Sequence, residues 1–189
     1  MAGAAVLPGH GSAGSPGVIE TARLRLRPIE LGDAPALAAN LTPAVTRSLA
    51  SWPDPMTAEI ARARIERSQA AATNGRHFFL AIVLKAGGEV IGGLSGGAAQ
   101  ADEMEIAYHL AERAQGHGYM REAARAALPY IWETFPVARV SAGAQADNAA
   151  SFGVMRALGM EPVGERRVFA SARNAHETHR FFAVARGGG

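Results

Sequence analysis

The chain has 189 residues, of which 48% are hydrophobic and 19% charged, which suits one globular domain with a sizeable core and excludes a chain disordered throughout. Its 19 basic and 17 acidic residues give a net charge of +2, too small to indicate a nucleic-acid-binding protein. There is no cysteine, so disulfides, thiolate metal ligands and a cysteine nucleophile are excluded.

Neither a membrane segment nor a secretion signal is predicted. The longest strongly apolar run, residues 78–84, is much shorter than the ~20 residues that a membrane-spanning helix requires. The first residues lack the basic start and the sustained apolar stretch of a signal peptide. We therefore expect a soluble, cytoplasmic protein that does not bind membranes.

Composition divides the chain into three parts. Residues 1–18 are mainly Gly, Ala, Ser and Pro, which cannot bury enough apolar surface to offset the entropy of ordering, so we expect a flexible N-terminal arm. The patterned sequence that follows predicts one domain over residues 19–186. Residues 187–189 are a short C-terminal tail.

The domain opens with an alternation of arginine and aliphatic residues over 23–28, which predicts a half-buried strand. Asp33 is placed to cap a short helix. The prolines that follow Trp52 forbid regular structure, and a longer helix is expected from Thr57 to about residue 72. We expect Trp52 to fill part of the core.

Three strands and a helix are expected next. Residues 77–85 and 89–94 are rich in aromatic and β-branched residues, and the glycine turn between them predicts a hairpin. Residues 103–110 alternate, which predicts a strand with one apolar and one polar face. Apolar residues at helical spacing over 120–131 predict a helix that Pro129 kinks or divides.

The last elements complete one domain. Residues 139–145 predict a strand, and Asn148 caps a helix that Gly159 terminates. Residues 162–169 and 178–184 predict two further strands. This order describes a single α/β (α+β) domain, with a mixed central sheet of about six to seven strands flanked by about four helices.

A glycine-rich loop over residues 113–120, with the sequence RAQGHGYM, lies between a predicted strand and a predicted helix. Glycines allow a ligand to approach the backbone, and the free N–H groups of the first helical turn can bind an anion such as pyrophosphate. The alternative is that Gly116 and Gly118 only make the turn. A Walker-type phosphate loop is excluded because it needs a lysine after its last glycine, and the only lysine of the chain is Lys85. A GxGxxG dinucleotide fingerprint is also excluded, because Arg121 occupies the position of the third glycine.

This loop, the strand before it and residues 148–160 resemble the GNAT superfamily of acyl-CoA-dependent N-acetyltransferases. The resemblance covers about residues 19–186. The family's pyrophosphate loop, Gln/Arg-x-x-Gly-x-Gly/Ala, is matched by Gln115-x-x-Gly118-x-Met120. An overlapping register, Arg113-x-x-Gly116-x-Gly118, also fits, but the distance to the helix favours the first.

Within the superfamily the sequence is most similar to the RimJ/RimL-like branch of ribosomal-protein-alanine acetyltransferases. The branch's opening pattern, Thr-x-Arg-Leu-x-Leu-Arg, is matched by residues 21–27, and its Glu-Ile-Gly-Tyr strand by residues 105–108. Its Asn-x-x-Ser…Leu-Gly-Phe helix is matched by Asn148, Ser151, Leu158, Gly159 and Met160. The sequence departs from the family pattern at three positions, with Ala107 for Gly, Met120 for Gly or Ala, and Met160 for Phe. Of these, the larger side chain of Met120 can crowd the loop.

The resemblance implies transfer of an acetyl group from acetyl-CoA to a primary amine, without a metal. It assigns Asn148 to the pantetheine arm, Ser151 to the departing thiolate, and backbone amides near His109 and Leu110 to the oxyanion. Tyr108 alternates with apolar positions and is expected to be packed. The implied cofactor-binding residues are His109, Leu110, Gln115, Gly116, His117, Gly118, Tyr119, Met120, Asn148 and Ser151.

The amine needs a base. An amine with a pKa of ~8–10 is mostly protonated at neutral pH, so a proton must leave before the nitrogen attacks the thioester. Glu105 is the predicted base because it matches the acidic residue of the family strand. The alternative is that Glu105 is only an exposed residue of the strand, without a catalytic role. Glu103 points the same way and is the second candidate for the base. Catalysis by His109 as the base, or through a water molecule, is a further alternative. The other histidines, including His176 and His179, are expected at the surface.

The identity of the acceptor is left open. The branch implies a protein N-terminal amine, especially that of alanine, whereas other relatives act on small amines and antibiotics. We expect the loop around Trp52 and residues 165–182 to frame the acceptor. A non-catalytic acyl-CoA-binding module is the alternative function, and the protein is expected to be a monomer or a homodimer.

Overall fold

The computed structural model describes residues 5–6, 17–100 and 102–187. Its strands are β1 (Ala5–Val6), β2 (Ile19–Glu20), β3 (Leu24–Pro28), β4 (His77–Leu84), β5 (Val90–Ala98), β6 (Glu103–Leu110), β7 (Arg139–Gln145), β8 (Glu161–Ala170) and β9 (Ala175–Ala185). Its helices are α1 (Ala34–Asn40), α2 (Pro43–Thr46), α3 (Ala58–Ala72), α4 (Tyr119–Thr134) and α5 (Ala149–Ala157), with short 3₁₀ turns η1 (Leu31–Asp33) and η2 (Glu112–Ala114).

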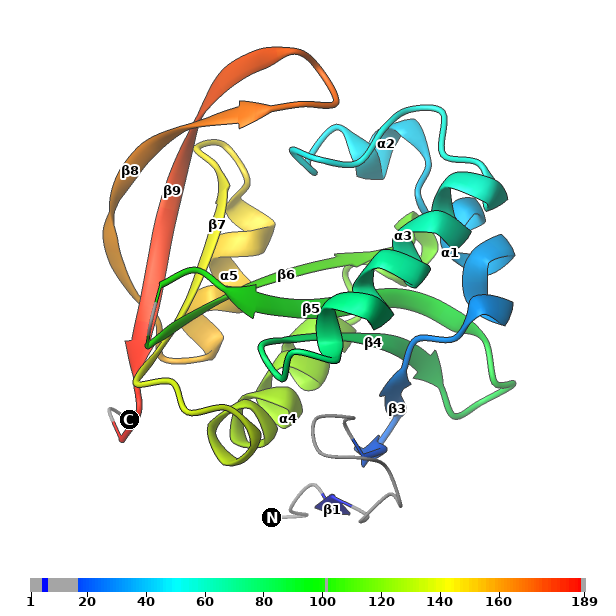
Figure 1. The fold of residues 1–189 in the computed structure, drawn as a ribbon, viewed down its shortest axis with the longest axis horizontal. Coiled ribbons are helices and arrows are strands. Elements are labelled where there is room, and N and C mark those ends of the chain that lie inside the picture. The colour runs from blue at the N-terminus through cyan, green and yellow to red at the C-terminus, as the bar shows by residue number, and fades with distance from the viewer. Residues whose placement is uncertain (1–4, 7–16, 101, 188–189) are drawn as a thin grey trace.

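All the strands join one mixed sheet, in the order β1-β2-β3-β4-β5-β6-β7-β9-β8. β6 and β7 run parallel, and the other neighbouring pairs are antiparallel. Helices lie on both faces of the sheet (Figure 1). The α/β fold that the order of elements predicts is therefore confirmed. Among the described residues, no helix has the length and hydropathy to cross a membrane.

The sheet has more strands than expected, because β1 and β2 extend its edge beyond β3. Each has two residues, too few for an alternating pattern to be recognised. Most of the predicted arm, residues 1–18, lies outside the described residues. Pro129 lies inside α4 and does not divide it, because α4 is one continuous helix from Tyr119 to Thr134. Residues on both sides of the proline, including Ala127 and Ile131, belong to the same core.

The two faces of the sheet carry separate cores. α4 and α5 cover one face, where they pack on residues such as Phe78 of β4 and Met104 of β6. α1 and α3 cover part of the other face, where they pack on Phe79 and Ala81 of β4. β4 is thus buried on both sides, which explains its uninterrupted apolar sequence.

Candidate active site

The parallel strands at the centre of the sheet part along their length. Pairing between β6 and β7 begins at Glu103 and Arg139 and ends at Glu105 and Ser141. Both strands continue well beyond this point, to Leu110 and Gln145. The second half of β6 therefore has no backbone partner on its β7 side.

The direction of the unpaired groups follows from the strand geometry. The N–H of Ala111 donates to the carbonyl of Ile91, on the β5 side. Successive N–H groups of a strand alternate in direction, so those of Leu110 and Tyr108 face the side from which β7 has parted, and that of His109 faces β5. Of the two positions expected to supply an oxyanion donor, Leu110 has the suitable orientation.

The glycine loop turns from this strand into α4. Gly116 and Gly118 have φ values of 80° and 78°, in the left-handed region that favours glycine. Gly118 is the N-cap of α4, and its carbonyl accepts from the N–H of Glu122 at 3.1 Å. The N–H groups of residues 119–121 precede this bond and lie at the positive end of the helix dipole. This is the local geometry that an anion-binding loop requires.

The side chains of the loop leave these amides clear. Met120 is 7% exposed and belongs to the larger core, so it does not crowd the loop as its departure from the family motif suggested. Gln115 Nε2 donates to the carbonyl of Leu110 at 3.1 Å and ties the loop to the end of β6. Arg113 instead contacts Asn40 of α1 at 3.0 Å. These directions favour the register of the motif that begins at Gln115.

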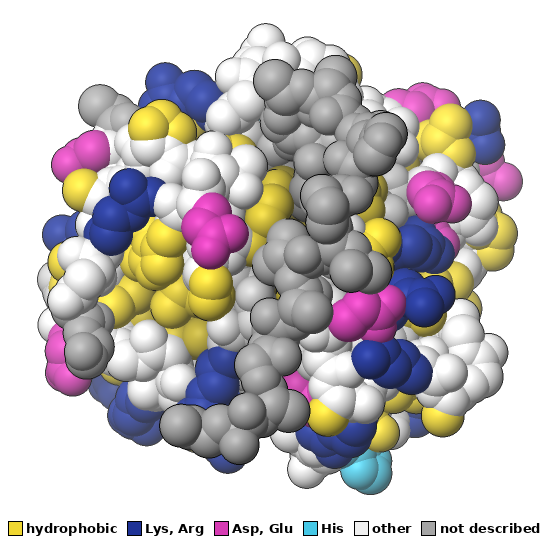
Figure 2. Space-filling model, turned by 90° about the horizontal axis from the view of Figure 1, so that it is seen from below, with side chains coloured by type: hydrophobic (Ala, Val, Ile, Leu, Met, Phe, Trp, Pro, Cys, Tyr) yellow, Lys and Arg dark blue, Asp and Glu magenta, His cyan; other side chains and the backbone are white. Residues whose placement is uncertain are grey.

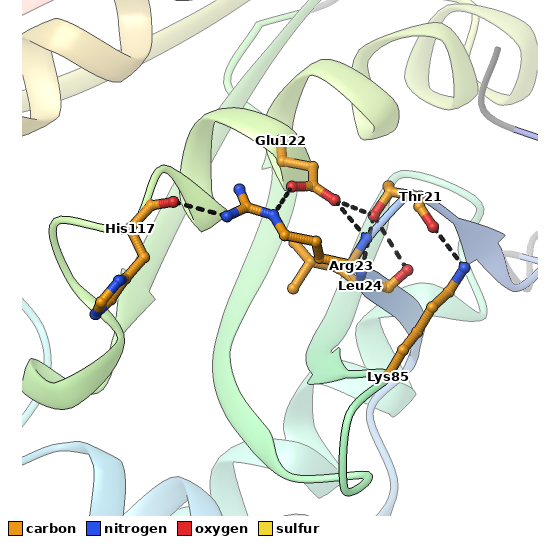
Figure 3. A network of polar contacts seen from close by, with 6 residues as sticks. All are labelled: Thr21, Arg23, Leu24, Lys85, His117 and Glu122. Atoms are coloured by element: carbon orange, nitrogen blue, oxygen red, sulfur yellow. Dashed lines mark hydrogen bonds and ion pairs between the residues drawn. The ribbon is translucent and has the colours of Figure 1, made fainter. Parts of the chain in front are cut away.

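The loop is also tied to the start of β3. Glu122, in the first turn of α4, accepts from Thr21 Oγ1 at 2.6 Å, from the Arg23 N–H at 2.9 Å and from Arg23 Nε at 2.7 Å. The same guanidinium donates to the His117 carbonyl at 3.0 Å and lies 4.5 Å from the Tyr119 ring centroid. Figure 3 shows Arg23 reaching from the strand to the loop. Although burial acts in the opposite direction, these hydrogen bonds lower the pKa of the Glu122 carboxyl.

A second group of contacts joins β6 to α5. Asn148 caps α5 through Oδ1, which accepts from the Ser151 N–H at 3.0 Å. Ser151 Oγ donates to the Tyr108 hydroxyl at 3.1 Å, and that hydroxyl donates to the Ser151 carbonyl at 3.2 Å. Burial raises the pKa of Tyr108 to about 12, although the hydrogen bond from Ser151 opposes the shift. Tyr108 is partly packed, as expected, but its hydroxyl belongs to the site, which the alternation of β6 did not reveal.

Glu103 and Glu105 lie on the polar face of β6, as predicted. Glu103 accepts from Ser141 Oγ at 2.5 Å and is thereby tied to β7. Glu105 makes no hydrogen bond or ion pair with the described residues. Glu105 is an exposed residue of the strand, as the alternative to a catalytic role supposed. The surrounding protein nevertheless desolvates its carboxyl and raises the pKa; Arg166 and His179 oppose this shift, and Glu103 adds to it. Glu105 therefore has the freer carboxylate.

His109 is enclosed on the same strand. Its ring centroid lies 5.5 Å from that of Trp52, which packs against the core of α1 and α3. Burial lowers the pKa of His109 to about 4, so the imidazole is neutral at physiological pH. A ring that is 7% exposed has little access to a substrate, and Glu105 is better placed as a base.

His179 was expected at the surface, but this prediction is wrong: His179 is buried, with 7% of its surface exposed. It lies on β9, opposite Gln145 of β7 and Arg166 of β8. β9 is inserted between these two strands, and the sequence pattern carries no signal for that insertion. His176, on the same strand, is exposed as expected.

The β8–β9 hairpin reaches the segment that follows α2. Arg173 Nη1, in the turn of the hairpin, donates to the carbonyls of Thr46 and Leu49, each at 3.3 Å. The N–H of Ala172 donates to the carbonyl of Ala50 at 3.2 Å. In Figure 1 the turn extends toward α2, above the open ends of β6 and β7. The two segments expected to frame the acceptor thus touch each other.

The electrostatics of the surface agree with the small net charge. In the face shown in Figure 2, Lys and Arg side chains are interspersed with Asp and Glu side chains. No group of His, Asp and Glu side chains is placed to hold a metal ion in the part of the chain that the structure describes.

A mixed sheet whose central strands part beside a glycine loop and a helix N-terminus is the architecture of an acyl-CoA-dependent acetyltransferase. The sequence profile of the acetyltransferase (GNAT) domain matches residues 23–161, and the chain belongs to this family. No curated protein matches the chain significantly.

Solved structures show the same fold. The ribosomal-protein-S5-alanine acetyltransferase from Vibrio fischeri is 23% identical, with a TM-score of 0.74 over 89% of this chain and 96% of that one. RimL, a ribosomal L7/L12 alpha-N-protein acetyltransferase in complex with coenzyme A, is 22% identical, with a TM-score of 0.77 over 89% and 97%. The microcin C7 self-immunity acetyltransferase MccE, in complex with acetyl-CoA and AMP, is 17% identical, with a TM-score of 0.77 over 88% and 94%. At these identities the likeness establishes the fold.

Proposed function

We propose that this protein is an N-acetyltransferase that moves an acetyl group from acetyl-CoA to a primary amine by direct attack of the amine on the thioester. The observation that carries the proposal is that β6 and β7 part after Glu105 and Ser141, which leaves the outward N–H of Leu110 without a strand partner, and that the loop after β6 leads through the left-handed Gly118 into the free amides of α4. Membership of the GNAT family supports it, as do the coenzyme A and acetyl-CoA complexes of RimL and MccE.

The proposed cofactor site uses mainly backbone groups. The amides of residues 116–121 bind the pyrophosphate, aided by the dipole of α4. Asn148 Oδ1 is engaged in capping α5, which leaves its Nδ2 to donate to a carbonyl of the pantetheine arm. The outward N–H of Leu110 then meets the thioester oxygen, where negative charge develops during attack.

The proposed chemistry begins with proton removal. Glu105 accepts a proton from the acceptor ammonium, and the freed nitrogen attacks the thioester carbon. When the tetrahedral intermediate collapses, the nitrogen gives its second proton to water, the C–S bond breaks and the thiolate leaves. The Tyr108 hydroxyl, which its raised pKa keeps protonated, supplies a proton to the sulfur, with Ser151 beside it.

For the acceptor we propose a protein N-terminal amine. The support is the resemblance of residues 21–27 to the ribosomal-protein-alanine branch, together with the activities named for the two ribosomal-protein acetyltransferases above. A small-molecule amine is the second candidate, because the self-immunity acetyltransferase MccE shares the fold. Among the described residues the acceptor side is framed by Trp52 and the β8–β9 hairpin.

Mass spectrometry of acetyl-CoA reactions tests the proposal. The panel contains peptides that begin with alanine or serine, the same peptides with blocked N-termini, and small primary amines. We expect acetylation of the free peptides and none of the blocked ones. If the protein binds CoA but acetylates no amine, it is a non-catalytic acyl-CoA-binding module and the proposal is wrong.

A further inference from the structure

A cavity of about 530 Å³ lies at the end of α3 and has no part in the site described so far. Its wall is formed by the last turn of α3 and the turn that follows, by the start of β4 and by the end of β5. Apart from alanine and glycine, the described residues that line it are polar, namely Asn74, Arg76, His77 and Gln100. The size and the polar lining suit a ligand such as a few residues of a peptide.

The cavity adjoins the row of residues that carries the proposed base. His77 of β4, Gly97 of β5 and Glu105 of β6 are paired in one register across three antiparallel strands. Directly opposite residues of such strands face the same side, with Cβ positions about 4.5–5.5 Å apart. Because Gly97 lines the cavity, Glu105 stands at its border, one strand away. The carbonyl of Glu103 also accepts from the N–H of Ala99, another lining residue, at 2.9 Å.

The row between the cavity and Glu105 is open. Gly97 has no side chain, and a Cβ added there would meet, outside its chain neighbours, a single described atom within 4 Å, His77 Nδ1 at 3.3 Å. Glu105 is exposed, and Gly97 and His77 are half-buried, so solvent reaches all three residues. A peptide chain can therefore pass over Gly97 from the carboxylate into the cavity.

His77 presents one ring nitrogen to this passage. Its Nε2 is hydrogen-bonded to Ser68 Oγ of α3 at 2.8 Å, which fixes the ring. Burial lowers the pKa of His77, so the imidazole is mainly neutral at physiological pH. Nδ1 makes no hydrogen bond with the described residues, and it can donate to or accept from a ligand according to the tautomer. A peptide group carries both a donor and an acceptor, so either tautomer can bind it.

The two ends of the passage carry opposite charges. Glu103 and Glu105 lie on the β6 side, where their carboxylates favour an ammonium. Arg76 lies on the far side of the cavity, where its Nη2 donates to the carbonyl of Gln100 at 3.2 Å. No carboxylate of the residues that the structure describes is paired with this guanidinium, so its remaining N–H groups can bind one. The arrangement fits an acceptor with a positive amine and a negative group a short distance away.

The strand spacing sets this distance. Neighbouring strands lie about 4.7–4.9 Å apart, so His77 and Glu105, which are two strands apart in one register, are separated by roughly 10 Å. Arg76 directly precedes His77. An extended peptide covers about 3.3–3.6 Å per residue, so a chain whose amine lies at Glu105 reaches the cavity with its second and third residues.

We propose that this cavity is a subsite for the acceptor peptide, and that the preferred acceptor carries an acidic side chain at its second or third residue. The N-terminal amine lies at Glu105, and the chain crosses Gly97 beside His77. The acidic side chain then pairs with Arg76. This inference rests on the proposed function and adds to it the kind of sequence that follows the acetylated amine.

The first experiment compares Arg76→Glu with Arg62→Glu, using peptides that begin with alanine and carry glutamate, glutamine or lysine at the second or the third residue. For the wild type we expect kcat/KM to be about tenfold higher with glutamate than with lysine, with glutamine between them. Arg76→Glu is expected to reverse this order. Arg62 is an exposed residue of α3 outside the cavity, and its reversal changes the net charge equally, so Arg62→Glu is expected to keep the wild-type order.

The second experiment closes the passage with Gly97→Val. Gly97 is not among the glycines with positive φ, and valine is favourable in strands, so the backbone accepts the change. The two acceptors are a pentapeptide that begins with alanine and alaninamide, which has the same amine but no second residue. We expect the ratio of kcat/KM for the peptide to that for alaninamide to fall about fivefold or more, because the branched side chain obstructs only the longer acceptor. The Kd for CoA, measured by calorimetric titration, is expected to stay unchanged.

The outcomes separate this inference from the proposed function. The subsite is overturned if the wild type acetylates all the peptides equally well, whatever the charge of their second and third residues. It is also overturned if Arg76→Glu keeps the wild-type order, if Arg62→Glu reverses it as well, or if Gly97→Val leaves the ratio unchanged. If Gly97→Val does not fold, the comparison of the two arginine variants decides. If the wild type acetylates no amine at all, the proposed function fails, and this inference fails with it.

Discussion

Gly118 allows the cofactor loop to be tested through the backbone alone. Its φ of 78° is left-handed, and a Cβ added there would meet Arg23 Nη2 at 3.7 Å, an ordinary contact. Space is therefore available, and the cost of Gly118→Ala is the conformation itself, roughly 1–2 kcal/mol for a residue other than glycine. Gly118→Val adds branching at Cβ and is expected to cost more.

The variant can lose this free energy in two places. If the loop keeps its shape, the free energy of unfolding falls and Tm drops by about 2–8 °C. If the loop relaxes, the amides of residues 119–121 turn away from the anion, and the same free energy appears as a five- to thirtyfold rise in the Kd for CoA, by an estimate of about 1.4 kcal/mol per factor of ten.

Calorimetric titration with CoA and thermal unfolding measure the two effects on the same samples. Gly118→Asn is the matched control, because asparagine tolerates the left-handed region, and it is expected to remain closer to the wild type in both measurements. The reasoning is refuted if Gly118→Val retains both the CoA affinity and the Tm of the wild type. It is also refuted if Gly118→Asn is as impaired as Gly118→Val, since any side chain would then be excluded.

Three further predictions concern single side chains. Glu105→Gln is expected to lower kcat by about 10²–10⁴ with unchanged CoA affinity. Because burial raises the pKa of Glu105, the acid limb of the wild-type pH profile should lie above 4.5, and a limb below it would contradict the assignment. Tyr108→Phe should slow turnover more than Ser151→Ala in steady-state assays, and the reverse order would make Ser151 the proton donor. Arg23→Gln should lower the free energy of unfolding, measured by chemical denaturation, by only about 1 kcal/mol, because the Arg23 side chain is half exposed. The same variant should weaken CoA binding severalfold in titrations, and an unchanged affinity would show that the loop does not depend on its contacts with Arg23.

Features that a few neighbouring residues decide could be predicted from the sequence. Asn148 caps α5 through the N–H of Ser151, three residues away, and Gly159 follows α5 with a φ of 74°. The two-residue alternation of β6 placed Glu105 opposite in direction to Met104, as the structure confirms. In each case the physical cause lies within one turn or one strand.

Features that depend on distant segments could not be predicted. The hydroxyls of Tyr108 and Ser151 are 43 residues apart in sequence, and nothing local indicates that β6 and α5 meet there. The burial of His179 depends on the position of β9 in the sheet. The contacts of Arg23 with the loop could not be predicted either, because an arginine in an alternating strand is expected to lie on the solvated face.

The position of β9 has a consequence for synthesis of the protein. This strand follows β8 in the chain but lies between β7 and β8. A nascent chain that has already been made through α5 therefore presents β7 with an open edge, which is a template for pairing with other chains. The edge closes only when residues 175–185 arrive, and the same event brings His179 to the side of Gln145. The glycine loop precedes β7 in the chain, so the loop that we propose for the pyrophosphate is synthesised before the β8–β9 hairpin that we propose to frame the acceptor.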